Sequence, residues 1–208
     1  MKYVSVAVDG PAGSGKSTIT KMVAKSLGFN YVDTGAMYRA LTFNFLSNNL
    51  SELDEERIKE LLSKVQFRVE YVDGVQYVYV NNEEVSDKIR TAEVSKYTSL
   101  FAKSPAVREF LIDTQRNLAH TNNIIMDGRD IASVVLPTAD VKIFLTADVK
   151  VRAERRYKEL TEKGENVNIT DIMADIKSRD EQDMNRAVSP LIQAEDAVLV
   201  DTSSLSID

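Results

Sequence analysis

The stretch VAVDGPAGSGKSTITK, residues 6–21, decides the fold class. An apolar run leads into a glycine-rich turn, and a segment with helical spacing of apolar residues follows. Residues 10–17 fit the pattern G-x-x-x-x-G-K-[ST], in which backbone N–H groups and a helix N-terminus surround phosphate. Lys16 would then reach the β- and γ-phosphates, and the Ser17 hydroxyl would bind Mg²⁺. A glycine-rich turn that merely caps a helix is the alternative, which the strand before and the helix after disfavour.

Composition narrows the class of protein further. The 208 residues suffice for one domain with a small insert, and 43% apolar with 28% charged residues is ordinary for a globular protein. A formal net charge of −6 disfavours non-specific nucleic-acid binding, and no stretch approaches the length of a membrane span. The chain has no cysteine, and its one histidine, His120, falls at a predicted helix end. We expect a soluble, cytoplasmic protein and, by default, a monomer.

Short apolar runs alternate with helical patterns along most of the chain, which predicts a parallel sheet with helices on both faces. The expected strands are residues 3–8, 30–33, 123–127, 141–147 and 197–201. The expected helices are a segment ending near Gly28, one after Pro105, and residues 36–48, 54–64, 149–163 and 170–186. The predicted fold class is therefore α/β, of the P-loop type.

Residues 65–85 interrupt this rhythm with the alternation of apolar and polar residues that is typical of strands. Asp73-Gly74 is a strong signal for a two-residue hairpin turn, and Asn81-Asn82 suits a second turn. We predict a small antiparallel insert, at about residues 63–97, within a single P-loop domain that spans residues 1–208.

Asp127 ends the predicted strand NIIMD and would emerge beside the glycine-rich loop. A Mg²⁺ site in a P-loop protein often uses such an acid, so we predict that Asp127 binds the metal directly or through water. The alternative is a turn-forming aspartate before Gly128.

Arginines gather in the second half of the chain. Arg152, Arg155 and Arg156 share one predicted helix face, and Arg179 precedes Arg186 by two turns on the next helix. Fixed arginines stabilise the negative charge that spreads over a phosphoryl group during its transfer. The alternative interpretation is that these arginines lie on solvated helix faces. No N-K-x-D motif occurs, which disfavours a switch GTPase. Several arginines around one phosphate loop instead favour phosphoryl transfer between two phosphorylated molecules.

Four motifs, DGPAGSGKST, VDTGAMYRA, DGRDIASVVLP and RDEQDMNRAVSPL, occur in an order that resembles the bacterial cytidylate kinase family from residue 3 to about 207. The resemblance implies ATP-dependent phosphorylation of CMP and dCMP with Mg²⁺, a P-loop core, a β-rich insert and a mobile lid at about residues 149–168. It implies an ATP site made of Gly10, Pro11, Ala12, Gly13, Ser14, Gly15, Lys16, Ser17 and Thr18.

The same resemblance implies the acceptor site. Three sets of residues would bind CMP: Thr34, Arg39, Arg129 and Arg186 its phosphate; Arg179 and Asp183 its ribose; and Ser99, Arg108 and Asp130 its base. Lys16 and Arg129 would act at the transferring phosphoryl group, together with lid arginines Arg152, Arg155 and Arg156. The metal ligands would be Ser17 and Asp127.

The base assignment also has a chemical reason. Cytosine offers an N4 amino donor that a carboxylate such as Asp130 accepts, and Arg108 can donate to O2 and N3. Uracil would mismatch both groups, so buried polar atoms would be left unpaired. A helix cap or a pair with Arg129 is the alternative for Asp130.

Two departures from the family pattern occur. Ala132-Ser133 stands where family members usually have Gly-Thr, and the chain ends at TSSLSID, without the further helix that the family usually carries. The rival functions are a kinase for UMP or AMP and a non-catalytic regulator that binds ATP.

Overall fold

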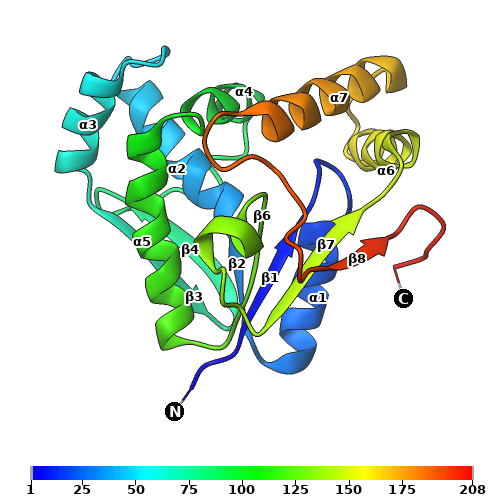
Figure 1. Ribbon diagram of the computed structural model, residues 1–208. Helices are drawn as coiled ribbons and strands as arrows, with labels where there is room; N and C mark the ends of the chain where they lie inside the picture. The colour runs from blue at the N-terminus through cyan, green and yellow to red at the C-terminus, as the bar shows by residue number, and fades with distance from the viewer. Residues whose placement is uncertain (1, 208) are drawn as a thin grey trace. The chain divides into compact units, whose positions relative to one another are not determined.

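The computed structural model describes residues 2–207. Its helices are α1 (Lys16–Leu27), α2 (Thr34–Ser47), α3 (Glu55–Lys64), α4 (Ala92–Phe101), α5 (Pro105–Thr121), α6 (Val149–Glu162) and α7 (Ile169–Asn185) (Figure 1). Its strands are β1 (Ser5–Asp9), β2 (Asn30–Asp33), β3 (Phe67–Val72), β4 (Val75–Val80), β5 (Glu83–Glu84), β6 (Ile124–Gly128), β7 (Val141–Thr146) and β8 (Val198–Asp201). A short π-helical turn, η1 (Ile131–Val135), follows β6.

The strands form two sheets. The larger has the order β2-β6-β1-β7-β8, and β7 pairs in parallel with both β1 and β8. The smaller, β3-β4-β5, is antiparallel. Parallel strands joined through helices, with a small antiparallel sheet inserted between α3 and α4, confirm the α/β class of the P-loop type predicted from the sequence.

The chain divides into two compact units, which we name by their contents. The P-loop unit comprises Val6–Val23 and Asp127–Asp208, and the insert unit comprises Met1–Ser5 and Ala24–Met126. The first holds β7, β8, η1, α6, α7 and most of β1. The second holds β2, the small sheet and helices α2 to α5.

Most helices begin where a polar side chain replaces a missing backbone partner. At each of these sites the side-chain oxygen accepts a hydrogen bond from an N–H of the first turn, which stabilises that turn. The capping residues are Asp33, Asp54, Thr91, Ser104, Asp148 and Asn168. Pro105 occupies the first turn of α5, where its missing N–H costs nothing.

The predicted hairpin turns of the insert are confirmed. Asp73 and Gly74 both have positive φ, 51° and 76°, as a tight turn between β3 and β4 requires. Asn81 and Asn82, with φ of 51° and 66°, form the turn into β5. Asparagine tolerates this left-handed conformation better than most residues do, which explains the choice of side chain.

The small sheet packs on helices of its own unit. Val78 and Val80 of β4 form a buried cluster with Ala36 and Ala40 of α2 and Val94 of α4. Phe45 of α2 contacts Phe101 of α4 edge-on, with ring centroids 4.9 Å apart. The insert is therefore part of a shared core with α2 and α4.

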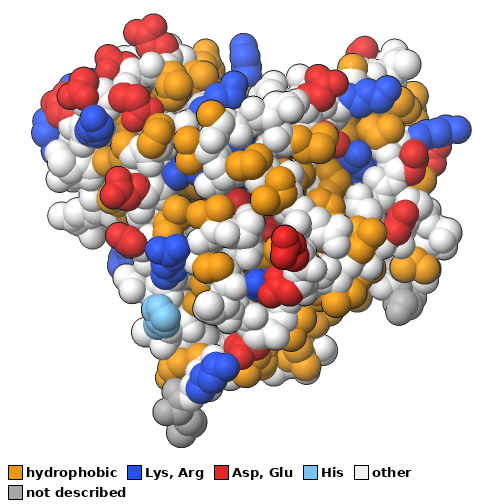
Figure 2. Space-filling view, in the orientation of Figure 1, with side chains coloured by type: hydrophobic (Ala, Val, Ile, Leu, Met, Phe, Trp, Pro, Cys, Tyr) orange, Lys and Arg blue, Asp and Glu red, His pale blue; other side chains and the backbone are white. Residues whose placement is uncertain are grey.

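The expected helix end at His120 is confirmed. This residue lies exposed in the last turn of α5, and histidine atoms are visible at the surface in Figure 2. Among residues 2–207, no helix combines the length and the apolar character that a membrane crossing requires.

Candidate active site

The glycine-rich loop joins β1 to α1 and curls around the amino group of Lys16. Lys16 is the first residue of α1 and is 5% exposed. Its Nζ donates hydrogen bonds to the Pro11 carbonyl oxygen at 2.8 Å and to Ser14 Oγ at 3.3 Å. The amino group is thus held inside the loop, which leads into the N-terminus of α1, the kind of helix end at which an anion is stabilised.

Two glycines of this loop are required by geometry. Gly10 has a φ of +149°, and a Cβ there would lie 2.0 Å from the Leu145 carbonyl oxygen of β7. Gly13 has a φ of +73°, in the left-handed region that L side chains rarely adopt. The loop can therefore take this course only with glycine at these positions.

The pKa of Lys16 is lowered to about 7. Burial is the largest cause, because it disfavours the charged form, and the neighbouring Arg129 lowers the pKa further. Asp127 and Asp9 oppose this shift. A bound phosphate would add negative charge beside Lys16 and raise its pKa.

Ser17 and Asp127 meet beside the loop. Ser17 Oγ donates to Asp127 Oδ2 at 2.7 Å, and Asp127 is 5% exposed. Within residues 2–207 no group of three or more His, Cys, Asp or Glu side chains could hold a metal. A hydroxyl and one carboxylate suit Mg²⁺, which takes few protein ligands and completes its shell with phosphate oxygens and water. The donor set therefore fits the predicted metal.

Asp9, at the end of β1, is a site residue that the sequence analysis missed. It is 1% exposed, and its carboxylate accepts hydrogen bonds from the N–H groups of Ile131 at 2.9 Å and Ala132 at 2.7 Å. Burial raises its pKa to about 6, although these two bonds lower it. An acid between a buried strand and a glycine is a signal that could have found Asp9.

The Ala132 departure leaves this loop intact. The N–H of Ala132 is one of the two groups that Asp9 binds. Val134 and Val135 both donate backbone hydrogen bonds to the Asp130 carbonyl oxygen. The turn is therefore held by its main chain and by Asp9, with alanine at position 132.

Asp130 is buried at the start of η1, and its side chain makes no capping hydrogen bond. Asp130 therefore stands at the N-cap position of η1, the alternative weighed above, without a side-chain capping bond. Its Oδ1 lies 3.5 Å from Arg186 Nη2, and Arg186 Nη1 lies 3.8 Å from Asp183 Oδ1. Arg129 Nε donates to Asp183 Oδ2 at 2.7 Å. Arg129, Asp130, Asp183 and Arg186 thus form one charged network.

The three arginines of α6 have different surroundings. Arg152 is buried and Arg156 is exposed, pairing with Glu159 at 2.7 Å. Arg155 is half-buried, and its Nη1 donates to Thr202 Oγ1 at 3.0 Å. A Cβ added at Gly15 would lie 4.0 Å from the same Nη1, so Arg155 borders the loop. The shared helix face does not give the three residues a shared environment.

Asp180 of α7 is a second residue that sequence reasoning missed. It is 6% exposed and accepts a hydrogen bond at 3.0 Å from the N–H of Ala12 in the loop. Its neighbour Arg179 is exposed on the same helix. Asp180 lies within the motif RDEQDMNRAVSPL, but neither its burial nor its partner is encoded in the spacing of that motif.

In the insert unit, the N-terminus of α2 combines a helix end with an arginine. Asp33 caps the helix through the N–H of Ala36 at 2.8 Å and pairs with Arg39 Nη2 at 3.1 Å. Thr34 is buried at the first helical position. Arg39 Nε has no hydrogen-bond partner among residues 2–207, so it can donate to an anion.

Gln76 of β4 fixes the chain just before this helix and was also missed. Its Oε1 accepts from the N–H of Asp33 at 2.7 Å, and its Nε2 donates to the Asp33 carbonyl oxygen at 3.2 Å. One amide therefore holds both backbone groups of the residue that caps α2.

Ser99 and Arg108 lie in the same unit as Thr34 and Arg39. Ser99 is half-buried on α4. Arg108 is buried on α5, where its Nη1 donates to the Ala102 carbonyl oxygen at 3.3 Å and its guanidinium carbon lies 5.7 Å from the centre of the Tyr38 ring. Arg39 and Arg108 thus each make polar contacts within this unit.

A buried lysine in a phosphate loop, an acid bonded to the loop's serine and several arginines around them define a P-loop phosphotransferase. The model of the family described as cytidylate kinase matches residues 6–208. Curated cytidylate kinases from Caldicellulosiruptor bescii and Leuconostoc mesenteroides are 48% and 49% identical over all of this chain, which spans 92% and 93% of their lengths.

A third relative, the cytidylate kinase of Halalkalibacterium halodurans, is 48% identical over 100% of this chain and 93% of its own length. A solved gluconokinase from Sinorhizobium meliloti 1021 aligns with a TM-score of 0.46 at 14% identity, covering 100% of this chain and 87% of that one, a likeness too low to bear on the fold. The chain belongs to the cytidylate kinase family and is a nucleoside monophosphate kinase, which confirms the family and enzyme class predicted from the sequence.

Proposed function

We propose that this protein transfers the γ-phosphoryl group of ATP to CMP and dCMP, giving ADP with CDP or dCDP. The observation that carries the proposal is the match to the cytidylate kinase family over residues 6–208. Two relatives that are 48% and 49% identical over the whole chain are named cytidylate kinase. A P-loop kinase for another monophosphate is the main rival.

The loop of Gly10–Thr18 binds the ATP phosphates, with Lys16 at the β- and γ-phosphates. Its lowered pKa supports this role, because an amino group whose charged form is disfavoured by burial gains most from an anionic ligand. Ser17 and Asp127 would hold Mg²⁺, which when bound neutralises charge on the phosphates. The 2.7 Å contact between their side chains supports a shared ligand.

Thr34, Arg39, Arg129 and Arg186 would each bind the phosphate of the acceptor CMP. The unpartnered Nε of Arg39 at the N-terminus of α2 supports this assignment. Arg179 and Asp183 bind the ribose.

Ser99, Arg108 and Asp130 read the cytosine. Asp130 and Arg108 are 5% and 2% exposed, so a hydrogen bond that either side chain makes to the base would be shielded from water. Buried hydrogen-bonding groups penalise a mismatched base strongly, because one of the partners would stay unsatisfied.

The chemistry needs no strong general base, because the attacking oxygen belongs to a phosphate that is anionic near neutral pH. Catalysis then consists of alignment and charge stabilisation, which Lys16 and Arg129 supply within the P-loop unit. Arg155 and Arg156 act from α6, at the start of the lid at residues 149–168, and exclude water when the substrates are bound.

A panel of CMP, dCMP, UMP and AMP with saturating ATP and Mg²⁺ tests the proposal. We expect the highest kcat/KM for CMP and dCMP. A preference for AMP would reject the base assignment, and the absence of any diphosphate product would favour a regulator that only binds ATP.

Two substitutions test the ATP-binding residues and the base-binding residues separately. Lys16→Ala should lower kcat by about 100-fold or more, because it removes a cation at the transferring group, while Lys25→Ala, an exposed lysine on the same helix, should not. Asp130→Asn should lower the CMP-to-UMP preference by at least about tenfold. Asp196→Asn, which changes an exposed acid of the same unit, serves as the control.

The enzyme family also favours a cytoplasmic location, where ATP and CMP are available. That location and a monomeric state stay predictions of the sequence.

A further inference from the structure

Both backbone polar groups of Ala12, inside the phosphate loop, are bound by one buried ion pair. The N–H of Ala12 donates to Asp180 Oδ1 at 3.0 Å, and its carbonyl oxygen accepts from Arg152 Nη1 at 2.7 Å. The same Nη1 lies 2.6 Å from Asp180 Oδ2, which closes a ring of three interactions. Arg152 Nε donates to the Ala147 carbonyl oxygen at 2.8 Å, which fixes the guanidinium in one orientation.

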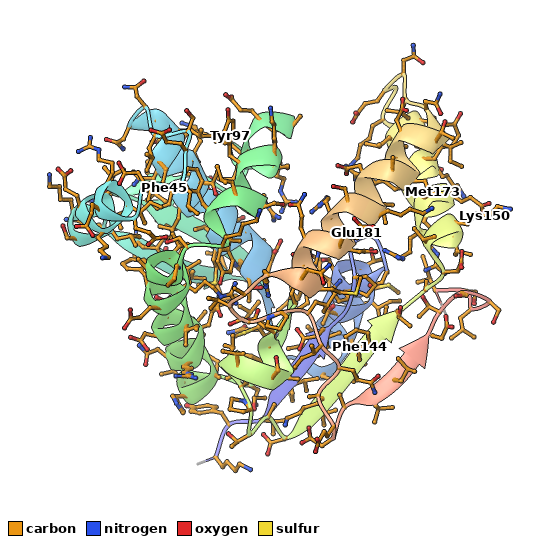
Figure 3. All side chains as sticks on the ribbon, turned by 45° about the horizontal axis from the view of Figure 1, so that its top comes forward. Phe45, Tyr97, Phe144, Lys150, Met173 and Glu181 are labelled. Atoms are coloured by element: carbon orange, nitrogen blue, oxygen red, sulfur yellow. The ribbon has the colours of Figure 1, made fainter. Side chains whose placement is uncertain are left out.

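This ion pair joins three parts of the P-loop unit that are far apart in the sequence. Arg152 comes from α6 and Asp180 from α7, two helices that pack side by side (Figure 3). Positions 12 and 180 are 168 residues apart. Gly13 packs against the same helices, since a Cβ added there would lie 3.5 Å from Arg152 Cβ and 3.7 Å from Ile176 Cδ1.

Burial of this ion pair has an energetic cost that other contacts must offset. The side chains of Arg152 and Asp180 are only 7% and 8% exposed. Burying two charges carries a desolvation penalty that their attraction offsets only when the remaining donors and acceptors are satisfied. Here the carboxylate and two of the guanidinium nitrogens find partners in the loop or next to it, so the loop is the element that the pair organises.

We propose that Arg152 and Asp180 are positioning residues that hold Ala12, and with it the first half of the phosphate loop, in the conformation that binds ATP. This inference rests on the proposed binding of ATP by residues 10–18. It gives Arg152 a role different from that of Arg155 and Arg156. The guanidinium of Arg152 is engaged with Ala12, Ala147 and Asp180, so it acts on the ATP phosphates through the loop.

Steady-state kinetics of Asp180→Asn and Arg152→Lys test the proposal. Asparagine leaves an amide N–H₂ facing the arginine, and lysine cannot serve the Ala12 and Ala147 oxygens together. A hydrogen bond to a charged group contributes about 1.5–3 kcal/mol, so each change should raise the KM for ATP by about tenfold or more. The KM for CMP and the kcat at saturating ATP should change less than about threefold.

The double variant Asp180→Asn/Arg152→Lys sharpens the test. Residues that act as one unit have non-additive effects. The KM of the double variant for ATP should therefore be close to that of the single variant with the higher KM. Independent, multiplying effects would overturn the proposal. A lowered kcat with an unchanged KM for ATP in Arg152→Lys would do so as well, because it would mean that Arg152 contacts the transferring group.

Hydrogen exchange gives a measurement that does not depend on turnover. The Ala12 amide should exchange slowly in the unmodified protein and at least tenfold faster in Asp180→Asn, because its acceptor is weakened, while the amides of β7 stay protected. Equal exchange of Ala12 in both proteins would overturn the proposal. If Asp180→Asn does not fold, Arg152→Lys, which keeps the charge, carries the same comparison.

Glu181→Gln is the matched control. It makes the same chemical change one position further along α7, on an exposed side chain that is labelled in Figure 3. It should leave the KM for ATP and the Ala12 exchange rate unchanged. Failure of the proposed function would appear differently, as loss of CMP phosphorylation in the unmodified protein.

Discussion

Ser17 Oγ of α1 donates a 2.7 Å hydrogen bond to Asp127 Oδ2 at the end of β6. A hydroxyl and a carboxylate in this contact can both turn their oxygens to one hard cation, and together with phosphate oxygens and water they would complete an octahedral shell. This contact is the structural basis of the metal assignment.

Asp127→Asn should therefore raise the free Mg²⁺ concentration needed for half-maximal activity by about tenfold, because the amide keeps an oxygen but loses the charge. Activity measured against free Mg²⁺ at fixed ATP checks this. Ser17→Thr keeps the hydroxyl and should stay near the unmodified value. A lowered kcat with the same Mg²⁺ dependence would remove Asp127 from the metal site.

Lys16 should take up a proton when ATP binds. With a pKa of about 7 it is mostly neutral at pH 8, and the phosphates restore the pKa towards its ordinary value, so binding of Mg·ATP should be accompanied by uptake of up to about one proton. Titration calorimetry in two buffers of different ionisation enthalpy measures this uptake. Lys16→Arg carries a permanent charge and should show none; equal uptake by both proteins would contradict the assignment.

Asp9 should make the folded state less stable as pH rises from about 4 to 6. Its folded pKa, about 6, lies above its ordinary value of 3.8, so in this window the folded protein binds more protons than the unfolded chain. Asp9 therefore contributes most below pH 4, and its contribution is lost as the pH rises through the folded pKa.

Urea unfolding at several pH values checks the Asp9 prediction. The difference in unfolding free energy between the unmodified protein and Asp9→Asn should shrink by about 1.4 kcal/mol for each unit of pH across the window. A difference that is constant with pH would show that Asp9 is ionised throughout.

Gln76→Glu should weaken CMP binding without affecting ATP. The carboxylate cannot donate to the Asp33 carbonyl oxygen and adds negative charge near the Asp33 side chain, so the N-terminus of α2 loses its fixed position. We expect the KM for CMP to rise by about tenfold, because Thr34 and Arg39 depend on this helix start. The KM for ATP in the same preparation is the control, and a parallel rise in both constants would argue for general loss of structure.

Local sequence patterns predict the elements of this fold well because each pattern has a local physical cause. The alternation in β3 and β4, the Asp73-Gly74 turn and the loop glycines are all visible within a few residues of sequence. Helix α4 was missed, since it carries few regularly spaced apolar residues and is fixed by its Thr91 cap and by packing on α2. The π-helical turn η1 depends on Asp9, which lies in another strand.

The site is less predictable, because its supporting contacts join distant positions. Asp9 binds backbone 122 residues away, Asp180 binds backbone 168 residues away, and Gln76 reaches 43 residues back to Asp33. The motifs predict which residues contact substrate, whereas these three residues bind main-chain groups that any sequence provides. Only the folded chain shows which main-chain groups they hold.

The close approach at Gly10 also limits how this enzyme can evolve. The atom that a Cβ would meet, 2.0 Å away, is a main-chain oxygen at position 145, so no exchange of the side chain there could make room. A genetic screen for second-site suppressors of Gly10→Ala should accordingly recover reversion alone. At Gly13 the neighbouring atoms at 3.5 and 3.7 Å belong to the side chains of Arg152 and Ile176, so space there is open to compensation and only the backbone angle of +73° holds the glycine in place.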